Sequence, residues 1–290
     1  MLYSYETIED IIALSQQYNC SFGDVVLRSE METYESSQEE VFQEIDRRLD
    51  IFEESIQAGL LNQGKTPSGM SGGQGNQLKL HVPKLLGVLP NKAMTYAIAV
   101  NEANAKMFRI VACPTAGSCG VLPGCMKAVT EYYPVPKSVL RQAFLVASGI
   151  GKIVAERACV AGAVGGCQAE VGTATAMAAG AVVSMMGGNV HQIANAVALS
   201  MKNVLGLVCD PVAGLVEVPC VKRNGFFAVQ ALTAAEMALA GIESQIPADE
   251  VIEAMNSLGR SLPASLRETS DGGLAKTPTG EAIEQKVRSL

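Results

Sequence analysis

The segment VGTATAMAAGAVVSMMGGNVHQIANAVALSM, residues 171–201, contains no Asp, Glu, Lys or Arg. A helix needs about 20 apolar residues to cross a bilayer, so length alone would permit a membrane span. Gly187–Asn189 interrupts the segment, however, and three polar side chains follow in its second half. Ala and Gly dominate, and such small residues let helices approach one another closely. We therefore predict two buried helices, over 168–186 and 189–205, inside a mainly α protein.

The composition is that of a globular chain with a sizeable core. Of the 290 residues, 48% are hydrophobic and 18% are charged, which argues against disorder. This length corresponds to one large domain or two smaller ones. The net charge is −7 and Lys and Arg form no block, so neither composition nor pattern favours a nucleic-acid partner. The N-terminus lacks the pattern of a signal peptide, so the eight Cys predict reduced thiols in the cytosol.

The pattern of charged and apolar residues divides the chain into three segments. Residues 1–60 are predicted to form an amphipathic helical segment, whose surface helix ends at Gly59. The apolar stripe of that helix consists of Val41, Ile45, Leu49, Phe52 and Ile56. Residues 61–270 are predicted to form a helical domain with buried Ala/Gly-rich helices and cysteine-bearing loops. Residues 271–290, rich in Gly, Thr and Pro, form a C-terminal tail.

Two loops interrupt the helical pattern. In the first, Gln63–Gly75, consecutive glycines offer backbone amides that can cradle an anion, and serines add hydroxyl groups. It is not a Walker loop, because its lysine precedes the glycines. A flexible linker between domains is the alternative interpretation. The second loop, Cys113–Gly120, places small hydroxyl and thiol groups among glycines, as expected where a backbone approaches a ligand.

A third loop, Cys209–Cys220, reads CDPVAGLVEVPC and has a thiol at each end. Its two prolines fix φ and remove backbone donors, so the loop cannot continue a helix. With Cys167, which lies in its own glycine-rich turn, it offers three thiolates for an iron–sulfur cluster that lacks one protein ligand. Alternatively, these cysteines are buried as small hydrophobic side chains. Glu170 lies close by, either paired in the core or placed beside a reacting centre.

Four motifs occur in order along about residues 60–270. They are SGMSGG at Ser68–Gly73, Asn101-Glu102 with CPTAG at Cys113–Gly117, GCQAEVG at Gly166–Gly172, and the Cys209–Cys220 loop. In these motifs the chain resembles the iron–sulfur-dependent L-serine dehydratases, specifically the α chain of the two-subunit form. The resemblance implies that 61–270 is a helical catalytic domain in which Cys167, Cys209 and Cys220 bind a [4Fe–4S] cluster. It implies that the other thiols are not ligands: Cys20, Cys113, Cys119, Cys125 and Cys159.

The resemblance also implies a reaction, the dehydration and deamination of L-serine to pyruvate and ammonia. The open iron would act as a Lewis acid on the serine hydroxyl while a base removes the Cα proton. His81 and His191 are the only histidines, and each is more typical of a structural role, so no base is assigned to this chain. A separate β chain is expected to help complete the site. Donors to the substrate carboxylate are expected from both loops: Ser68, Ser71, Gly72, Thr115 and Gly117.

Three alternatives remain open from the sequence. An aconitase-like hydro-lyase would apply the same Lewis-acid chemistry to a hydroxy acid. A helical membrane or scaffold protein would carry inert cysteines. A zinc protein is the third, although three cysteines as widely spaced as Cys167, Cys209 and Cys220 form no zinc ribbon or finger.

Overall fold

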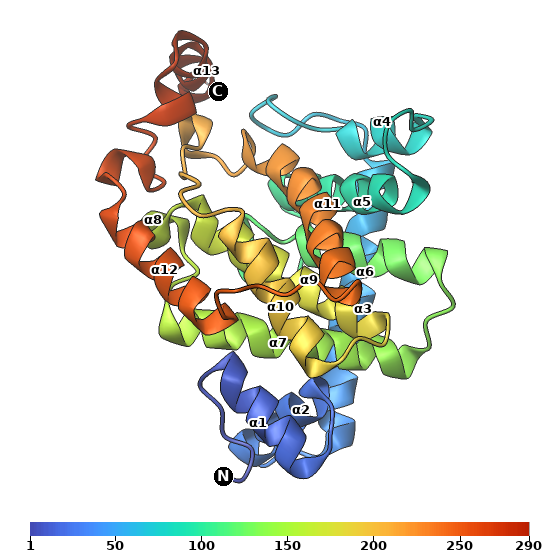
Figure 1. Ribbon diagram of the computed structural model, residues 1–290. Helices are drawn as coiled ribbons and strands as arrows, with labels where there is room; N and C mark the ends of the chain where they lie inside the picture. The colour runs from blue at the N-terminus through green and yellow to red at the C-terminus, as the bar shows by residue number, and fades with distance from the viewer. Residues whose placement is uncertain (290) are drawn as a thin grey trace.

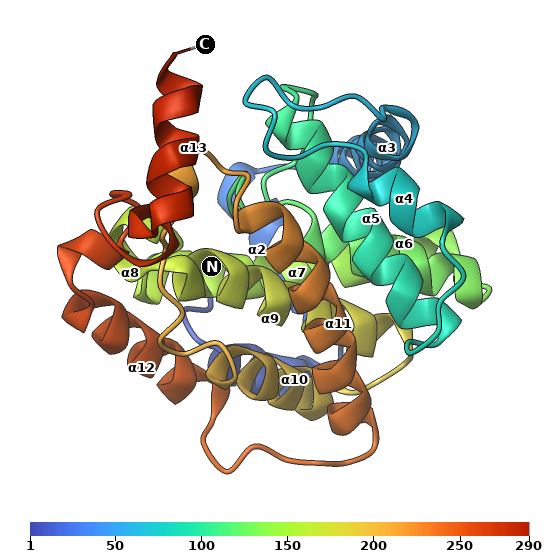
Figure 2. The ribbon, with the colours of Figure 1, turned by 90° about the horizontal axis from the view of Figure 1, so that it is seen from above.

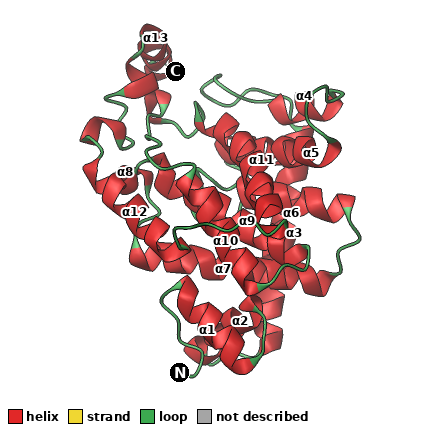
Figure 3. Ribbon diagram, viewed as in Figure 1, coloured by secondary structure: helices red, strands yellow, loops and turns green. Residues whose placement is uncertain are grey.

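The computed structural model describes residues 1–289 and is mainly α, as predicted (Figures 1 and 3). Within this range there are thirteen α-helices and no strand, and one isolated parallel bridge joins Cys209 to Arg267. The helices are α1 (Ile8–Tyr18), α2 (Phe22–Tyr34), α3 (Gln38–Leu61), α4 (Gln74–Leu80), α5 (Val88–Ala105), α6 (Val121–Tyr132), α7 (Lys137–Arg157), α8 (Gly162–Gly165), α9 (Thr173–Met185), α10 (Val190–Lys202), α11 (Cys220–Leu239), α12 (Ala248–Ser261) and α13 (Pro278–Arg288). Shorter turns are η1 (Gln168–Gly172, a π-turn) and the 3-10 turns η2 (Val212–Gly214), η3 (Ala264–Leu266) and η4 (Gly273–Lys276).

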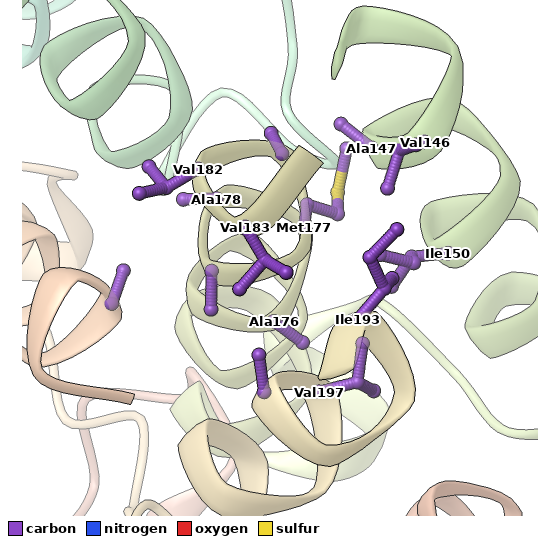
Figure 4. Close-up of a cluster of buried hydrophobic side chains, with 14 of the residues drawn as sticks. Val146, Ala147, Ile150, Ala176, Met177, Ala178, Val182, Val183, Ile193 and Val197 are labelled. Carbon is purple, nitrogen blue, oxygen red and sulfur yellow. The ribbon is translucent and has the colours of Figure 1, made fainter. Parts of the chain in front are cut away.

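Helix α9 lies at the centre of the fold, with α6, α7, α10 and α11 packed around it (Figure 2). Every residue of α9 except Ser184 is buried. Figure 4 shows Met177 and Val182 of α9 in the cluster of apolar side chains that it shares with α7 and α10. A Cβ on Gly180 would collide with Ile150 of α7, so this glycine permits the close approach of the two helices. The predicted pair of buried helices is confirmed.

The N-terminal helices α1, α2 and α3 each begin with a capping box, in which a hydroxyl residue and an acidic residue satisfy each other's backbone amides. The capping residues are Thr7, Ser21 and Ser37. The apolar stripe predicted for α3 faces the core, where α5 packs against it. The predicted end of α3 at Gly59 is wrong, because the helix continues to Leu61. Gly59 lies where α3 meets α5, and a Cβ there would collide with the backbone of Ala99.

The helices around the predicted loops complete the fold. Helix α5 lies between the first and second loops, and α6 begins directly after the second loop. Helix α11 begins at Cys220, so the last cysteine of the third loop is the first residue of the helix. The C-terminal tail contains α13, whose Thr277 N-cap and following proline are local signals for the start of a helix.

Helix α7 is the one helix within residues 1–289 that is long and apolar enough to cross a membrane. In this fold 56% of its most apolar window is buried, and it packs against α9 and α2. These are the properties of a core helix in a globular protein. The uncharged segment 171–201 is divided between α9 and α10, and the turn at Gly187–Asn189 separates them.

We expect Gly59→Ala to lower the thermal midpoint of the chain, because the added methyl group forces α3 away from α5. Overpacking of this kind costs about 1–3 kcal/mol, although Ala has the higher helix propensity. Gln57→Ala, an exposed position on the same helix, is the matched control and should change stability by less than about 0.5 kcal/mol. Thermal unfolding followed by circular dichroism measures both. An unchanged midpoint for Gly59→Ala would contradict this packing.

Candidate active site

The three cysteines of the predicted ligand set are all buried, and they come from three places along the chain. Cys167 directly precedes η1, and Cys220 is the first residue of α11. Cys209 lies in the loop before η2, where it bridges to Arg267. Cys167 and Cys209 share a small apolar cluster with Val171. The fold therefore brings together thiols that are far apart in the sequence.

The cysteine pocket favours one thiolate. A hydrogen bond from the Cys209 thiol holds the pKa of Cys167 below its ordinary value, and the nearby Arg223 guanidinium acts in the same direction. The same interaction with Cys167 raises the pKa of Cys209, and burial raises it further. Burial raises the pKa of Cys220 to about 12. Further thiolates in this pocket need added positive charge, which a bound metal would supply.

The positive charge beside the cysteines comes from Arg223, on the first turn of α11. Its guanidinium donates to the Val208 carbonyl and to Asp210 Oδ1, each at 3.0 Å. Asp210 is 4% exposed, and its Oδ2 accepts the Leu274 N–H at 2.9 Å. Arg223 therefore ties the cysteine loop to α11, and through Asp210 it also ties the loop to the C-terminal segment.

Among residues 1–289, no three His, Cys, Asp or Glu side chains converge tightly enough to hold one metal ion. Cys209 and Glu170 both lie against the backbone of Gly162, because a Cβ there would lie 3.0 Å from Cys209 Sγ and 2.8 Å from Glu170 Oε2. Gly162 therefore permits the close approach of these two side chains. Metal binding by Cys167, Cys209 and Cys220 stays a prediction.

Glu170 connects the cysteine pocket with the turn formed by residues 115–117. Thr115 donates to Glu170 Oε1 at 2.8 Å, and a Cβ on Gly117 would lie 3.2 Å from the same oxygen. Burial raises the pKa of Glu170. Glu170 is thus paired through Thr115 and also lies close to Cys209, because its Oε2 and Cys209 Sγ both adjoin Gly162. A position beside a reacting centre stays a prediction. Thr115 and Gly117, two predicted substrate-binding residues, thus lie next to the candidate centre.

Three hydroxyl groups of the first loop bind one buried carboxylate of the cysteine loop. Thr66 donates to Glu217 Oε2 at 2.6 Å and Ser68 donates to Oε1 at 2.7 Å, while Ser71 also donates to Oε2. Glu217 is 5% exposed. A segment held in this way is not a flexible linker. Ser68 and Ser71, two further predicted substrate-binding residues, therefore lie against the loop that carries Cys209 and Cys220.

The glycine-rich turn of the first loop does cradle an anion, but this anion belongs to the protein itself. Glu102 of α5 is fully buried and accepts the backbone N–H groups of Gly72, Gln74 and Gly75 at 2.9–3.1 Å. Amides at the start of a helix, here α4, readily donate to a carboxylate. The amide of Gly72 is therefore engaged by Glu102, and a role for Gly72 in substrate binding stays a prediction.

Two asparagines to which the sequence assigned no role hold the second loop. Asn224 Nδ2 donates to the Gly117 carbonyl at 2.8 Å, and its Oδ1 accepts the Gly120 N–H at 2.9 Å. Asn101 Nδ2 donates to the same Gly117 carbonyl at 3.1 Å. In the sequence, only their neighbours distinguish these two residues: Asn101 precedes Glu102 in a motif, and Asn224 follows two cationic residues.

The starts of three helices meet at this site. Gly120 precedes α6, Glu170 lies in η1, which continues directly into α9, and Cys220 begins α11. The hydrogen bonds of Thr115 to Glu170 and of Gly120 to Asn224 join these starts to one another. Helix N-termini carry partial positive charge, so the arrangement favours negatively charged groups at this point.

The sequence assigns neither of the two histidines and none of the five other cysteines to the site. His191 is exposed on α10, where its Nε2 pairs with Gln16 at 3.1 Å, and His81 is exposed at the end of α4. Burial raises the pKa of three other thiols, those of Cys113, Cys119 and Cys125. Cys20 and Cys159 are only half-buried. That these five cysteines are not ligands stays a prediction.

The fold and site thus define a mainly helical protein with a buried cysteine pocket at the starts of three helices. Residues 17–275 match the family described as "Serine dehydratase alpha chain". The chain therefore belongs to the serine dehydratase alpha chain family.

Curated relatives agree with this family. A "Probable L-serine dehydratase, alpha chain" of Bacillus subtilis is 46% identical, over 98% of this chain and 95% of the relative. An "L-serine dehydratase, alpha chain" of Peptoniphilus asaccharolyticus is 40% identical, over 96% of this chain and 97% of the relative. "L-serine dehydratase 2" of Escherichia coli is 35% identical over 94% of this chain, but only 62% of that longer relative is covered.

We expect Arg223→Met to destabilise the chain by about 3–5 kcal/mol, because it leaves the buried Asp210 carboxylate without its cationic partner. The control is Arg260→Met, which removes an exposed arginine of α12 and should cost less than about 0.5 kcal/mol. Urea unfolding curves of both variants measure the difference. Equal midpoints for the two variants would show that the ion pair with Asp210 does not hold the cysteine loop in place.

Proposed function

We propose that this chain is the α chain of an iron–sulfur-dependent L-serine dehydratase. The reaction removes water from L-serine, and the resulting 2-aminoacrylate tautomerises and hydrolyses to pyruvate and ammonia. The observation that carries the proposal is the buried pair of thiols, Cys167 and Cys209, beside Arg223 in a chain of the serine dehydratase family. The cytoplasm, where thiols stay reduced, is the compartment that suits these free cysteines.

Cys167, Cys209 and Cys220 would hold a [4Fe–4S] cluster that has one position without a protein ligand. When bound, such a cluster supplies a Lewis acid for the serine hydroxyl. The chain's own groups prepare the pocket, because Arg223 offsets part of the negative charge of the thiolates. Apolar side chains around Cys167 and Cys209 keep water away from this side of the pocket.

The carboxylate of serine needs hydrogen-bond donors, and the two loops beside the cysteines are the candidates. In the first loop, the Ser68 and Ser71 hydroxyls each donate their one proton to Glu217, so they would have to exchange this partner to bind the substrate carboxylate. The second loop offers the turn formed by residues 115–117. Glu170 orients this second turn by accepting the Thr115 hydroxyl. Both loops are thus fixed to segments that carry cysteines. The base for the Cα proton is not assigned to this chain.

A second polypeptide, the β chain, would complete the enzyme. The family description names an alpha chain, which implies a partner. The Escherichia coli relative extends well beyond the 62% of its length that this chain covers, which leaves room for a second region in the same polypeptide. Both histidines of this chain are exposed outside the cysteine pocket, which agrees with a base supplied by that partner.

Protein purified without oxygen should be coloured and contain about four irons and four labile sulfides per chain. Cys209→Ala should lose the colour, the iron and pyruvate formation from serine, because it removes a buried ligand. The control is Cys20→Ala, which changes a half-buried thiol between α1 and α2 and should retain all three properties. Metal and sulfide analysis with visible absorption measures these outcomes. Colourless protein that still releases ammonia from serine would refute the proposal.

The isolated chain, loaded with iron and sulfide, should be weakly active or inactive with serine. Mixing it with the β chain should restore activity, because the partner is expected to bring the base. Pyruvate release, measured at increasing ratios of β to α chain, should rise and saturate. Full activity of the α chain alone would contradict a shared site.

A further inference from the structure

Glu217 is a buried carboxylate in the middle of the cysteine loop, and its partners lie far away in the sequence. The hydroxyl groups of Thr66, Ser68 and Ser71, between 146 and 151 positions earlier, all donate to it. Two of them share Oε2 and the third uses Oε1, so both carboxylate oxygens are occupied. Hydrogen bonds to a charged acceptor are stronger than those between neutral groups. This contact is therefore a firm link between the first loop and the cysteine loop.

A second buried carboxylate, Glu102, binds the C-terminal end of the same loop. Glu102 of α5 accepts backbone N–H groups from Gly72 to Gly75, directly after the hydroxyl-bearing residues. Helix α5 packs against α3, α6 and α11, so this end of the loop is fixed to the helical core. The hydroxyl groups at the other end are bound by Glu217. The position of the Ser68–Gly72 segment is therefore determined by the helical core and the cysteine loop together.

Backbone hydrogen bonds around Glu217 connect its contact with the first loop to the segment that carries Cys220. The Glu217 N–H donates to the Leu215 carbonyl at 2.7 Å, and the Val221 N–H donates to the Glu217 carbonyl at 3.0 Å. Val212 and Val218 are joined across the loop by a backbone hydrogen bond of 2.9 Å. Cys220 follows in the same turn at the start of α11. A displacement of the Glu217 side chain thus shifts the hydroxyl loop relative to Cys220.

We propose that Glu217 is a positioning residue that seats the Ser68–Gly72 loop against the cysteine pocket and so determines how well the substrate carboxylate is held. This inference rests on the proposed function, because it assumes that the loop binds serine. Glu217 would act through the hydroxyl groups that donate to it. Replacing its charge should weaken substrate binding while the cysteine ligands stay in place.

The test is Glu217→Gln in the complete α–β enzyme prepared without oxygen. The amide keeps the size of the side chain but removes its charge, and its NH₂ group cannot accept a hydroxyl donor. At least one of the three hydrogen bonds must therefore reverse its direction, and the others lose their charged acceptor. Iron and sulfide content should equal that of wild type, and KM for serine should rise roughly tenfold or more, with a smaller change in kcat. The control Glu236→Gln removes an exposed carboxylate of α11 and should leave KM unchanged.

A second readout does not depend on activity. Amide hydrogen exchange in residues 66–71 of the chain without cluster should be at least tenfold faster in Glu217→Gln than in wild type, because the loop loses its link to the cysteine loop. Thr66→Val removes one donor from the other side of the contact and should change exchange and KM in the same direction. It also keeps the test available if Glu217→Gln fails to fold.

The possible failures are distinguishable. A KM within twofold of wild type, or unchanged exchange in residues 66–71 for both variants, would overturn the positioning role of Glu217. Loss of iron from Glu217→Gln would also overturn it, because the residue would then support the ligands rather than the substrate loop. Absence of iron or of serine turnover in wild type would instead refute the proposed function, and the exchange result would still report on the link.

Discussion

The close packing around α9 is the constraint on which the rest of the structure depends. Its side chains are small and nearly all buried, so α6, α7, α10 and α11 can approach it closely. Once these helices are placed, the starts of α6, α9 and α11 lie together at one site. Cys167 and Glu170 precede α9 by less than two turns, so the burial of α9 also fixes their position. The loops of the site are short extensions of a rigid core.

Three carboxylates, rather than surface charges, organise these loops, and two of them, Glu102 and Glu217, are buried while Glu170 is half-buried. Glu102 is satisfied by backbone amides, Glu170 by the Thr115 hydroxyl and Glu217 by three hydroxyl groups. A buried carboxylate is costly unless several donors satisfy it, so each of these groups restricts the segments that supply the donors. Donor groups that are oriented in advance lose less entropy when a ligand arrives. The result is a pair of loops with defined positions relative to the cysteines.

Much of the fold could be predicted because helical periodicity and end signals are local. Helix α7 spans Lys137–Arg157 directly after Pro136, a residue that signals the start of a helix in the sequence itself. Helix α6 was missed because it begins with the sequence VLPGC, in which Pro and Gly resemble helix breakers although Pro is tolerated in the first turn. The start of α11 was missed for a similar reason, since Pro219 was taken as part of a loop and instead occupies the N-cap.

The sequence by itself determined the helical class and the burial of α9 and α10, and it predicts which thiols and loops carry the chemistry of the site. These features follow from side-chain periodicity and from motifs in which neighbouring residues act together. Only the tertiary structure decided that the anion in the glycine-rich turn is Glu102, and that the Ser68 and Ser71 hydroxyls are bound by Glu217. No local pattern encodes these pairings, because donors and acceptors as many as 149 positions apart meet only when the helices between them have packed.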